Sequence, residues 1–314
     1  MKKRLLIPAM VLFFGCLANR DNYESIRKTP KLKIETPPAC VWLRDSTFMD
    51  MTEVRNLDYL EFLYWTSRHE PERYDSLLPD TNCFQHVLEM GDPFVNYYLR
   101  HPAYRDYPVV GISYEQAVAF CEWRSKMVNR FIYIRDSKQK FKTAESWDTI
   151  THAPEVMHFR LPTREEWEYA AAAGLDPELY PYGYKQLADR KKLPVSNTAE
   201  YYRLFSNSSG YDRARESDDF RSMDSNTYPG SVYFGQPNSY SIWNLLGNVS
   251  ELTADTLIKG YNYKTTRDGV YMGNDSSFVR RREEINGRAY YRNSFVYKGP
   301  ECWLGFRCVC DVLK

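Results

Sequence analysis

The stretch Ser241–Leu252, SIWNLLGNVSEL, combines an apolar run with the oxygen-bearing side chains of Asn244 and Glu251. These two residues flank a Gly-Asn turn, so their side-chain oxygens and the backbone carbonyls of Gly247 and Val249 could converge on one ion. Calcium prefers such mixtures of carboxylate, amide and carbonyl oxygens around a tight turn. A Gly-Asn pair between apolar runs is also typical of a plain hairpin turn, and the residues alone leave both interpretations open.

Thiols and imidazoles are the other groups able to do chemistry. The chain has no HExxH, GxGxxG or GxxxxGK[ST] pattern. Only His152 and His158 approach metal-ligand spacing, and we interpret them as solvated or hydrogen-bonded side chains. Six cysteines follow Cys16, and their pairing is not fixed by the sequence: Cys40, Cys83, Cys121, Cys302, Cys308 and Cys310.

Two capping boxes predict the helices that position these groups. Ser113 with Gln116 predicts a helix from Tyr114 to about Val128, with Cys121 on its inward stripe. In FRLPTREEWEYAAAAG, Thr163 and Glu166 predict a second helix start, and Gly174 is placed to end that helix in a left-handed conformation. We therefore expect two main helices embedded in a loop-rich body with short strands.

The chain ends in WLGFRCVCDV, whose strict alternation predicts a strand. Phe306, Cys308, Cys310 and Val312 share one face of it, so both thiols should point the same way. Arg307, Val309 and Asp311 should face the opposite side.

The segment before the first capping box is less regular. Asn56 is placed to cap a helix that ends near His69, with apolar positions at Leu57, Leu60, Leu63 and Tyr64. Prolines then interrupt the chain, so we expect an insertion at about 69–107 that holds at most short helices. Its tyrosines suit either a protein interface or simple coverage of the core: Tyr97, Tyr98, Tyr104 and Tyr107.

The N-terminus has the layout of a signal peptide. Lys2, Lys3 and Arg4 precede the apolar stretch Leu5–Phe14, which is too short to span a bilayer. Gly15 and Cys16 follow it and resemble a bacterial lipoprotein signal, in which the cysteine is lipidated. An ordinary cleaved signal is the alternative. We expect residues 1–15 to be the signal peptide, 16–39 a Pro-rich tether and 40–314 one domain.

Composition excludes several classes of protein. Of the 314 residues, 43% are hydrophobic and 16% aromatic, which is too rich in core-forming side chains for a disordered chain. The formal charge is +1, from 42 basic and 41 acidic residues, so we expect no nucleic-acid partner. Export would place the cysteines in an oxidising compartment.

Four blocks in one order resemble the formylglycine-generating enzyme (sulfatase-modifying factor) family. They are GISYEQAVAFCEWRSKMVN, FRLPTREEWEYAAAAGLDPELYPYG, SIWNLLGNVSEL and WLGFRCVCD, and the resemblance covers Asp50 to Asp311. It implies an α+β fold related to C-type lectins, loop-rich, with two main helices packed on short strands.

The resemblance also implies site residues. It gives structural calcium at the turn, held by the Asn244 side chain, the Gly247 and Val249 carbonyls and the Glu251 carboxylate. A looser match implies a second calcium site at Asn197, Thr198, Asp218 and Phe220. The family further implies a disulfide between Cys121 and Cys308, for which two buried free thiols are the alternative.

Catalysis is where the sequence departs from the family. The family's oxidases bind copper(I) between two cysteines a few residues apart, because two soft thiolates suit that ion. No cysteine lies between Cys121 and Cys302, so we expect no copper and no catalytic residue. The sequence thus predicts a noncatalytic scaffold or binding protein.

A narrower resemblance points to a machine component. The stretches MDMTEVRNLDYLEFLYW and DPFVNYYLRHPAYRDYPVVGISYEQA look like gliding-motility and type IX secretion lipoproteins of Bacteroidetes. This implies a lipid anchor in the outer membrane, a domain on the periplasmic face, with surface exposure left open, and protein partners in an envelope complex. The alternatives are a glycan- or peptide-binding module on the same fold and, less favoured, a metal-dependent oxygenase.

Overall fold

A computed structural model describes the parts of the chain that form the core and the candidate site. The described residues are 35–85, 92–137, 150, 153–175, 229–233, 237–245, 248–254, 265–266, 269–270 and 299–313. The predicted signal peptide, Cys16 and the tether as far as residue 34 lie outside them. Within the described stretches, no helix has the length and apolarity needed to cross a membrane.

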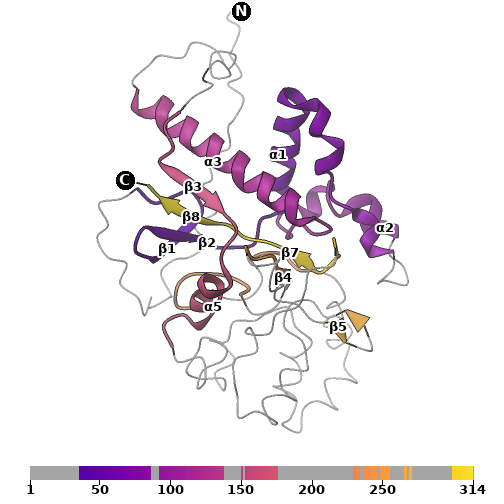
Figure 1. Cartoon of the computed structure of the whole chain (residues 1–314). Helices are drawn as coiled ribbons and strands as arrows, with labels where there is room; N and C mark the ends of the chain where they lie inside the picture. The colour runs from indigo at the N-terminus through magenta and orange to yellow at the C-terminus, as the bar shows by residue number, and fades with distance from the viewer. Residues whose placement is uncertain are drawn as a thin grey trace, which may run out of the picture.

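A four-stranded antiparallel sheet lies at the centre of the fold, in the order β1-β2-β8-β3. The strands are β1 (Cys40–Arg44), β2 (Thr47–Asp50), β3 (Met157–Arg160) and β8 (Val309–Val312). The last strand along the chain therefore lies inside the sheet, between the N-terminal hairpin and β3 (Figure 1). Cys308, Cys310 and Val312 pack in one core cluster and Val309 in the other, which confirms the predicted faces of this strand.

One helix covers each face of this sheet (Figure 1). Helix α3 (Tyr114–Asp136) packs with the face that carries Cys308 and Cys310, and α5 (Arg164–Ala172) packs with the face that carries Val309. The mixture of helices and short strands confirms the expected α+β class.

Both capping boxes form as predicted. The Ser113 hydroxyl accepts from the Gln116 backbone N–H, and the Thr163 hydroxyl accepts from that of Glu166. Gly174 has φ +78°, the predicted left-handed conformation, directly after the left-handed Ala173. Helix α3 continues two turns beyond the predicted end near Val128.

The first helix has the predicted bounds but a different cap. Helix α1 spans Asn56–His69, and its N-cap is Arg55, whose backbone N–H and Nε both donate to Asp58 Oδ2. Asn56 instead donates its side-chain amide to the carbonyls of Tyr98 and Tyr104, so the predicted cap is wrong. The apolar stripe is also shifted from the predicted one, because the buried positions are Asn56, Tyr59, Phe62, Leu63 and Thr66.

In the described residues of the insertion, all helices are short, as expected. They are η2 (Pro71–Arg73), η3 (Asp75–Leu77), η4 (Thr81–Phe84), α2 (Asp92–Tyr97) and η5 (Pro102–Tyr104). Tyr98 is 1% exposed, and Tyr104 and Tyr107 pack against the same core. Of the four tyrosines named for a protein interface, only Tyr97 is largely exposed, so the other three cover the core.

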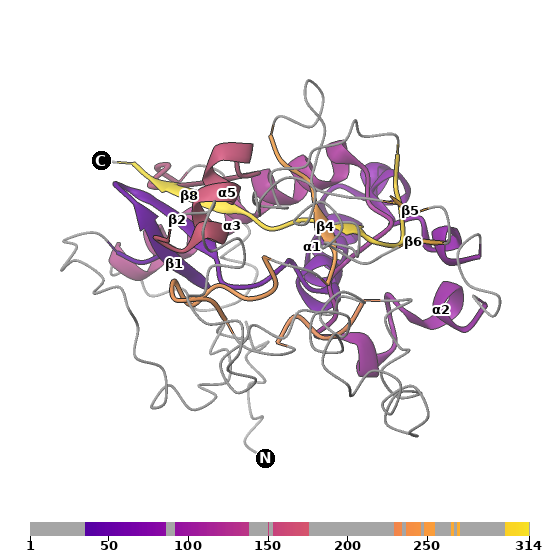
Figure 2. The same ribbon diagram turned by 90° about the horizontal axis from the view of Figure 1, so that it is seen from below.

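The terminal segment, residues 299–313, connects the central sheet to the candidate site. Strand β4 (Ser250–Glu251) pairs in parallel with β7 (Leu304–Gly305), and β5 (Thr265–Thr266) pairs antiparallel with β6 (Gly269–Val270). Figure 2 follows the terminal segment, in yellow, from β8 across to β4. The terminal segment also contacts the residues after β2, because the Val54 N–H donates to the Phe306 carbonyl.

Candidate functional site

Glu251 and Arg307 form a fully buried ion pair at the centre of the candidate site. Glu251 ends β4, and Arg307 lies between β7 and β8. Arg307 Nε and Nη2 each lie 2.7 Å from a different carboxylate oxygen of Glu251. The indole Nε1 of Trp167, from α5, donates to Glu251 Oε2 over 2.8 Å. Both oxygens of the Glu251 carboxylate are therefore engaged by side chains of this protein.

Arg307 also binds two backbone carbonyls. It donates to the carbonyl of Asp50 over 3.2 Å and to that of Trp243 over 2.9 Å. Burial opposes its charge, but the surrounding carboxylates, with Glu251 foremost and Glu53 and Asp50 adding to it, together hold the pKa of Arg307 above its usual value. One guanidinium thus ties together the end of β2, the Asn-containing turn and β4.

A second buried carboxylate, Glu53, lies near enough to this pair for both of its charges to act on it. Its oxygens accept from Asn248 Nδ2 over 3.0 Å and from Asn244 Nδ2 over 3.3 Å. Burial raises the pKa of Glu53 to about 8; Arg307 opposes this shift and Glu251 adds to it. The Arg307 guanidinium therefore acts on both carboxylates, through direct hydrogen bonds to Glu251 and through its charge alone on Glu53.

The turn owes its shape to its two asparagines. Asn244 and Asn248 have φ +54° and +60°, the left-handed region that asparagine tolerates better than most residues. Their side chains also hold the neighbouring segment: Asn248 accepts from the Gly230 N–H over 2.8 Å, and Asn244 donates to the Val232 carbonyl over 2.9 Å. Asn244 and Asn248 are therefore packed and hydrogen-bonded within the core.

The calcium ligands predicted at this turn are only partly brought together in a suitable form. Carboxylate, amide and carbonyl oxygens are the donors that calcium prefers. The Glu251 carboxylate, however, accepts three hydrogen bonds from Arg307 and Trp167, so calcium would have to compete with a guanidinium for it. Val249 is buried beside it, and Gly247 lies outside the described residues. Calcium binding at this turn therefore stays a prediction.

The other predicted metal ligands have no described position. The second calcium site falls wholly outside the described residues: Asn197, Thr198, Asp218 and Phe220. Among the side chains that are described, no group of three or more His, Cys, Asp or Glu is placed to hold a metal ion. His158 is half exposed and contacts Glu155 over 2.7 Å, and His152 is not described.

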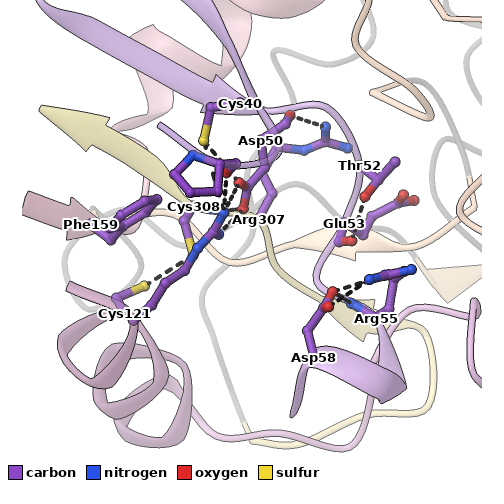
Figure 3. A network of polar contacts seen from close by, with 12 residues as sticks. Cys40, Asp50, Thr52, Glu53, Arg55, Asp58, Cys121, Phe159, Arg307 and Cys308 are labelled. Atoms are coloured by element: carbon purple, nitrogen blue, oxygen red, sulfur yellow. Dashed lines mark hydrogen bonds and ion pairs between the residues drawn. The ribbon is translucent and has the colours of Figure 1, made fainter. Parts of the chain in front are cut away.

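The two cysteines that the family resemblance pairs do meet. Cys121 Sγ of α3 lies 3.5 Å from Cys308 Sγ, and both side chains are buried (Figure 3). A disulfide between them stays a prediction. Asp50 lies beside this pair and accepts from the Cys308 backbone N–H over 2.9 Å.

Sequence reasoning found Asn244 and Glu251 but missed Glu53 and the role of Arg307. Glu53 belongs to the stretch MDMTEVRN, which mixes two acidic residues with polar and apolar ones and carries no local signal that Glu53 is buried. Arg307 was expected on a strand face, yet its partner Glu251 lies 56 residues away in the chain. Such a pairing is visible only once the two segments are folded against each other.

The chain is similar to several known proteins. The family described as "Sulfatase-modifying factor enzyme 1-like domain" matches residues 2–312. The formylglycine-generating enzyme of Mus musculus is 25% identical over 311 residues, covering 86% of this chain and 67% of that protein. The inactive C-alpha-formylglycine-generating enzyme 2 of Bos taurus is 27% identical over 179 residues, covering 52% of this chain.

The matches differ in how much of each relative they cover. The chain spans 41% of that inactive bovine protein and 45% of the bovine formylglycine-generating enzyme, to which it is 25% identical over 230 residues. Among solved structures, CarF has 17% identity and a TM-score of 0.42, covering 90% of this chain and 95% of that one. Treponema denticola variable protein 1 has 15% identity and a TM-score of 0.41, covering 88% and 92%.

Proposed function

The chain belongs to the sulfatase-modifying factor enzyme 1-like domain family, and on that premise we propose that it is a noncatalytic member. In this proposal the domain is a scaffold component of an envelope complex, anchored by lipid at Cys16 in the outer membrane. The resemblance to gliding-motility and type IX secretion lipoproteins gives the kind of complex.

The distribution of cysteines carries the proposal. A copper(I) site of the family's kind needs two thiolates a few residues apart. No cysteine lies between Cys121 and Cys302, and all six described cysteines are buried. Cys121 contacts Cys308, and Cys302 contacts Cys83, so these thiols are already engaged with one another. The described cysteines therefore do not fit the family's copper(I) site.

The buried polar centre supports a structural role for the retained turn. Glu251, Arg307 and Glu53 are each at most 1% exposed, and their partners come from the same core. Buried ion pairs and amides that satisfy one another hold chain segments in register. A centre closed in this way gives a substrate no described group to meet.

The relatives support both readings of the family. One is named an inactive enzyme and another a formylglycine-generating enzyme, and each name applies to that protein. The choice for this chain therefore depends on its own residues, above all on the missing cysteine pair.

Copurification from native membranes tests the scaffold role. Leu313 is 42% exposed, so a tag at the C-terminus would be accessible. We expect gently extracted wild-type protein to carry envelope proteins in fixed stoichiometry. A Cys16→Ala variant, which cannot be acylated at this position, is the matched control and should leave the membrane fraction.

Three results would contradict the proposal or part of it. A protein purified alone would remove the scaffold role, and one carrying a sugar or a peptide would favour the binding module instead. Lipid labelling of Cys16→Ala equal to wild type would remove the anchor while leaving the scaffold role to the copurification.

A further inference from the structure

Cys83 and Cys302 are neighbours in space although they lie far apart in the chain. Cys83 belongs to η4 in the insertion, and Cys302 lies just before β7 in the terminal segment. Their side chains are in hydrogen-bonding contact, and they are 6% and 0% exposed. Neither the sequence motifs nor the family resemblance assigns a partner to either residue.

Backbone contacts through Gly111 hold the two cysteines in place. The Gly111 N–H donates to the Glu301 carbonyl over 3.0 Å, and the Gly111 carbonyl accepts from the Asp80 N–H over 2.7 Å. Gly111 has φ +70°, and a Cβ there would lie 2.3 Å from the Asp80 oxygen and 3.2 Å from Cys83 Sγ. Only glycine allows this close approach, which brings the insertion and the terminal segment against each other.

Each of the other four described cysteines either already contacts another cysteine or lies too far from its counterpart for a disulfide. Cys121 already lies against Cys308. Cys40 is on β1, Cys310 is on β8, and β2 runs between those two strands. Strands two positions apart are separated by about 9 to 10 Å. That spacing exceeds the Cα separation of about 7 Å beyond which a disulfide cannot close.

We propose that Cys83 and Cys302 form a disulfide in the exported protein, whereas Cys40 and Cys310 remain thiols. This inference rests on the proposed function only through export to an oxidising compartment. The cross-link would fasten the inserted helices to residues 301–305, so the terminal segment would be held from the insertion as well as from α3.

The oxidation needs an external acceptor. The two thiols lose two protons and two electrons, and the disulfide of an envelope thiol–disulfide oxidoreductase accepts them and becomes a dithiol. The contact with Cys302 and burial both raise the pKa of Cys83. Since thiolates are the attacking species, the bond must form during folding, while the two residues are still accessible.

Cys40 and Cys310 should stay reduced in the folded protein. The Cys40 thiol donates to Asp50 Oδ1 over 3.3 Å, and burial holds its pKa well above the usual value. Burial likewise raises the pKa of Cys310 to about 12. Both are thus protonated and shielded in the folded protein, which keeps them out of thiol–disulfide exchange.

Peptide mapping of the full chain tests the inference. The protein is secreted to a bacterial periplasm, denatured in the presence of an alkylating reagent, digested without reductant and analysed by mass spectrometry. We expect one cross-linked species to join the peptides of Cys83 and Cys302, with Cys40 and Cys310 alkylated. In Cys83→Ser, Cys302 should become alkylated, whereas Cys310→Ser, the matched control, should leave the cross-link intact.

The Cys121–Cys308 link separates failure of the inference from failure of export. If Cys121 and Cys308 are joined while Cys83 and Cys302 are both alkylated, this inference is overturned and export stands. A bond from Cys83 or Cys302 to any other cysteine also overturns it. If all six cysteines are alkylated, both this inference and the predicted Cys121–Cys308 disulfide are overturned, and the scaffold role is still judged by copurification.

Discussion

Arg124 of α3 binds Asp50 of β2 through two hydrogen bonds, with Nη1–Oδ2 2.7 Å and Nη2–Oδ1 2.8 Å. The guanidinium also lies over the Phe159 ring, 4.2 Å from its centroid. Asp50 in turn accepts from the Cys308 N–H, so this pair joins the long helix to β2 and the terminal segment.

Loss of that guanidinium should destabilise the fold strongly. In Arg124→Ala the Asp50 carboxylate stays buried without its cation, and we expect a loss of about 3 to 5 kcal/mol in the free energy of unfolding. Urea unfolding measures this. Arg164→Ala, which removes a partly exposed pair with Glu168, is the control and should cost less than about 1 kcal/mol. Equal losses in the two variants would show that Asp50 and Arg124 act as a surface pair.

The Glu251–Arg307 pair should show strong coupling in a double-mutant cycle. Arg307→Met leaves the buried Glu251 carboxylate without a cation, and we expect it to cost about 3 to 5 kcal/mol. Adding Glu251→Gln removes the stranded charge, so the double variant should be more stable than the sum of the two single losses predicts. Unfolding free energies of the four proteins give the coupling. Additive losses would mean that the two charges do not depend on each other.

Glu53 should make stability depend on pH. Its pKa is raised from 4.5 to about 8, so the folded state keeps a proton that the unfolded state releases near pH 4.5. The contribution is fully present below about pH 4.5 and is lost as the pH rises through about 8. Glu53→Gln should therefore gain stability relative to wild type between about pH 5 and about pH 8.

The quantity to follow is the difference in unfolding free energy between Glu53→Gln and wild type at each pH. This difference is needed because Glu61, whose pKa burial raises to about 7, titrates in the same range. Glu61→Gln is the matched control for that background. A constant difference between Glu53→Gln and wild type across the range would show that Glu53 does not titrate there.

Calcium binding at the turn has a direct thermal test. If calcium binds the folded protein there, it should raise the melting temperature of the wild type, and a chelator should reverse the shift. Glu251→Gln, which keeps the size of the side chain but loses its charge, should respond less. An unchanged wild-type melting temperature would mean that Arg307 alone neutralises Glu251.

Local sequence signals predicted the starts of α3 and α5 because each capping box lies within four consecutive residues. They did not predict the end of α3. Asn129 lies beyond the expected end, and its side chain bonds the backbone of Met157 through both its amide nitrogen and its oxygen. That tertiary contact with β3 stabilises a helix that has no local stop signal.

The candidate site was likewise predictable from the sequence only in part. Asn244 and Glu251 could be found because they share one short stretch with a Gly-Asn turn. Glu53 and Asn248, by contrast, lie 195 residues apart in the chain, and nothing local marks them as partners. The cap of α1 was misplaced for a related reason, because Asn56 uses its side chain to bind the insertion rather than its own helix.

The absence of catalysis is the central claim, and one assay tests it most directly. The purified protein is supplied with copper(I), oxygen and a cysteine-containing peptide of the sulfatase type, and mass spectrometry follows conversion of the thiol to the aldehyde. An active formylglycine-generating enzyme serves as the positive control. The account predicts no aldehyde above the background without protein. Copper-dependent conversion by this chain would contradict it.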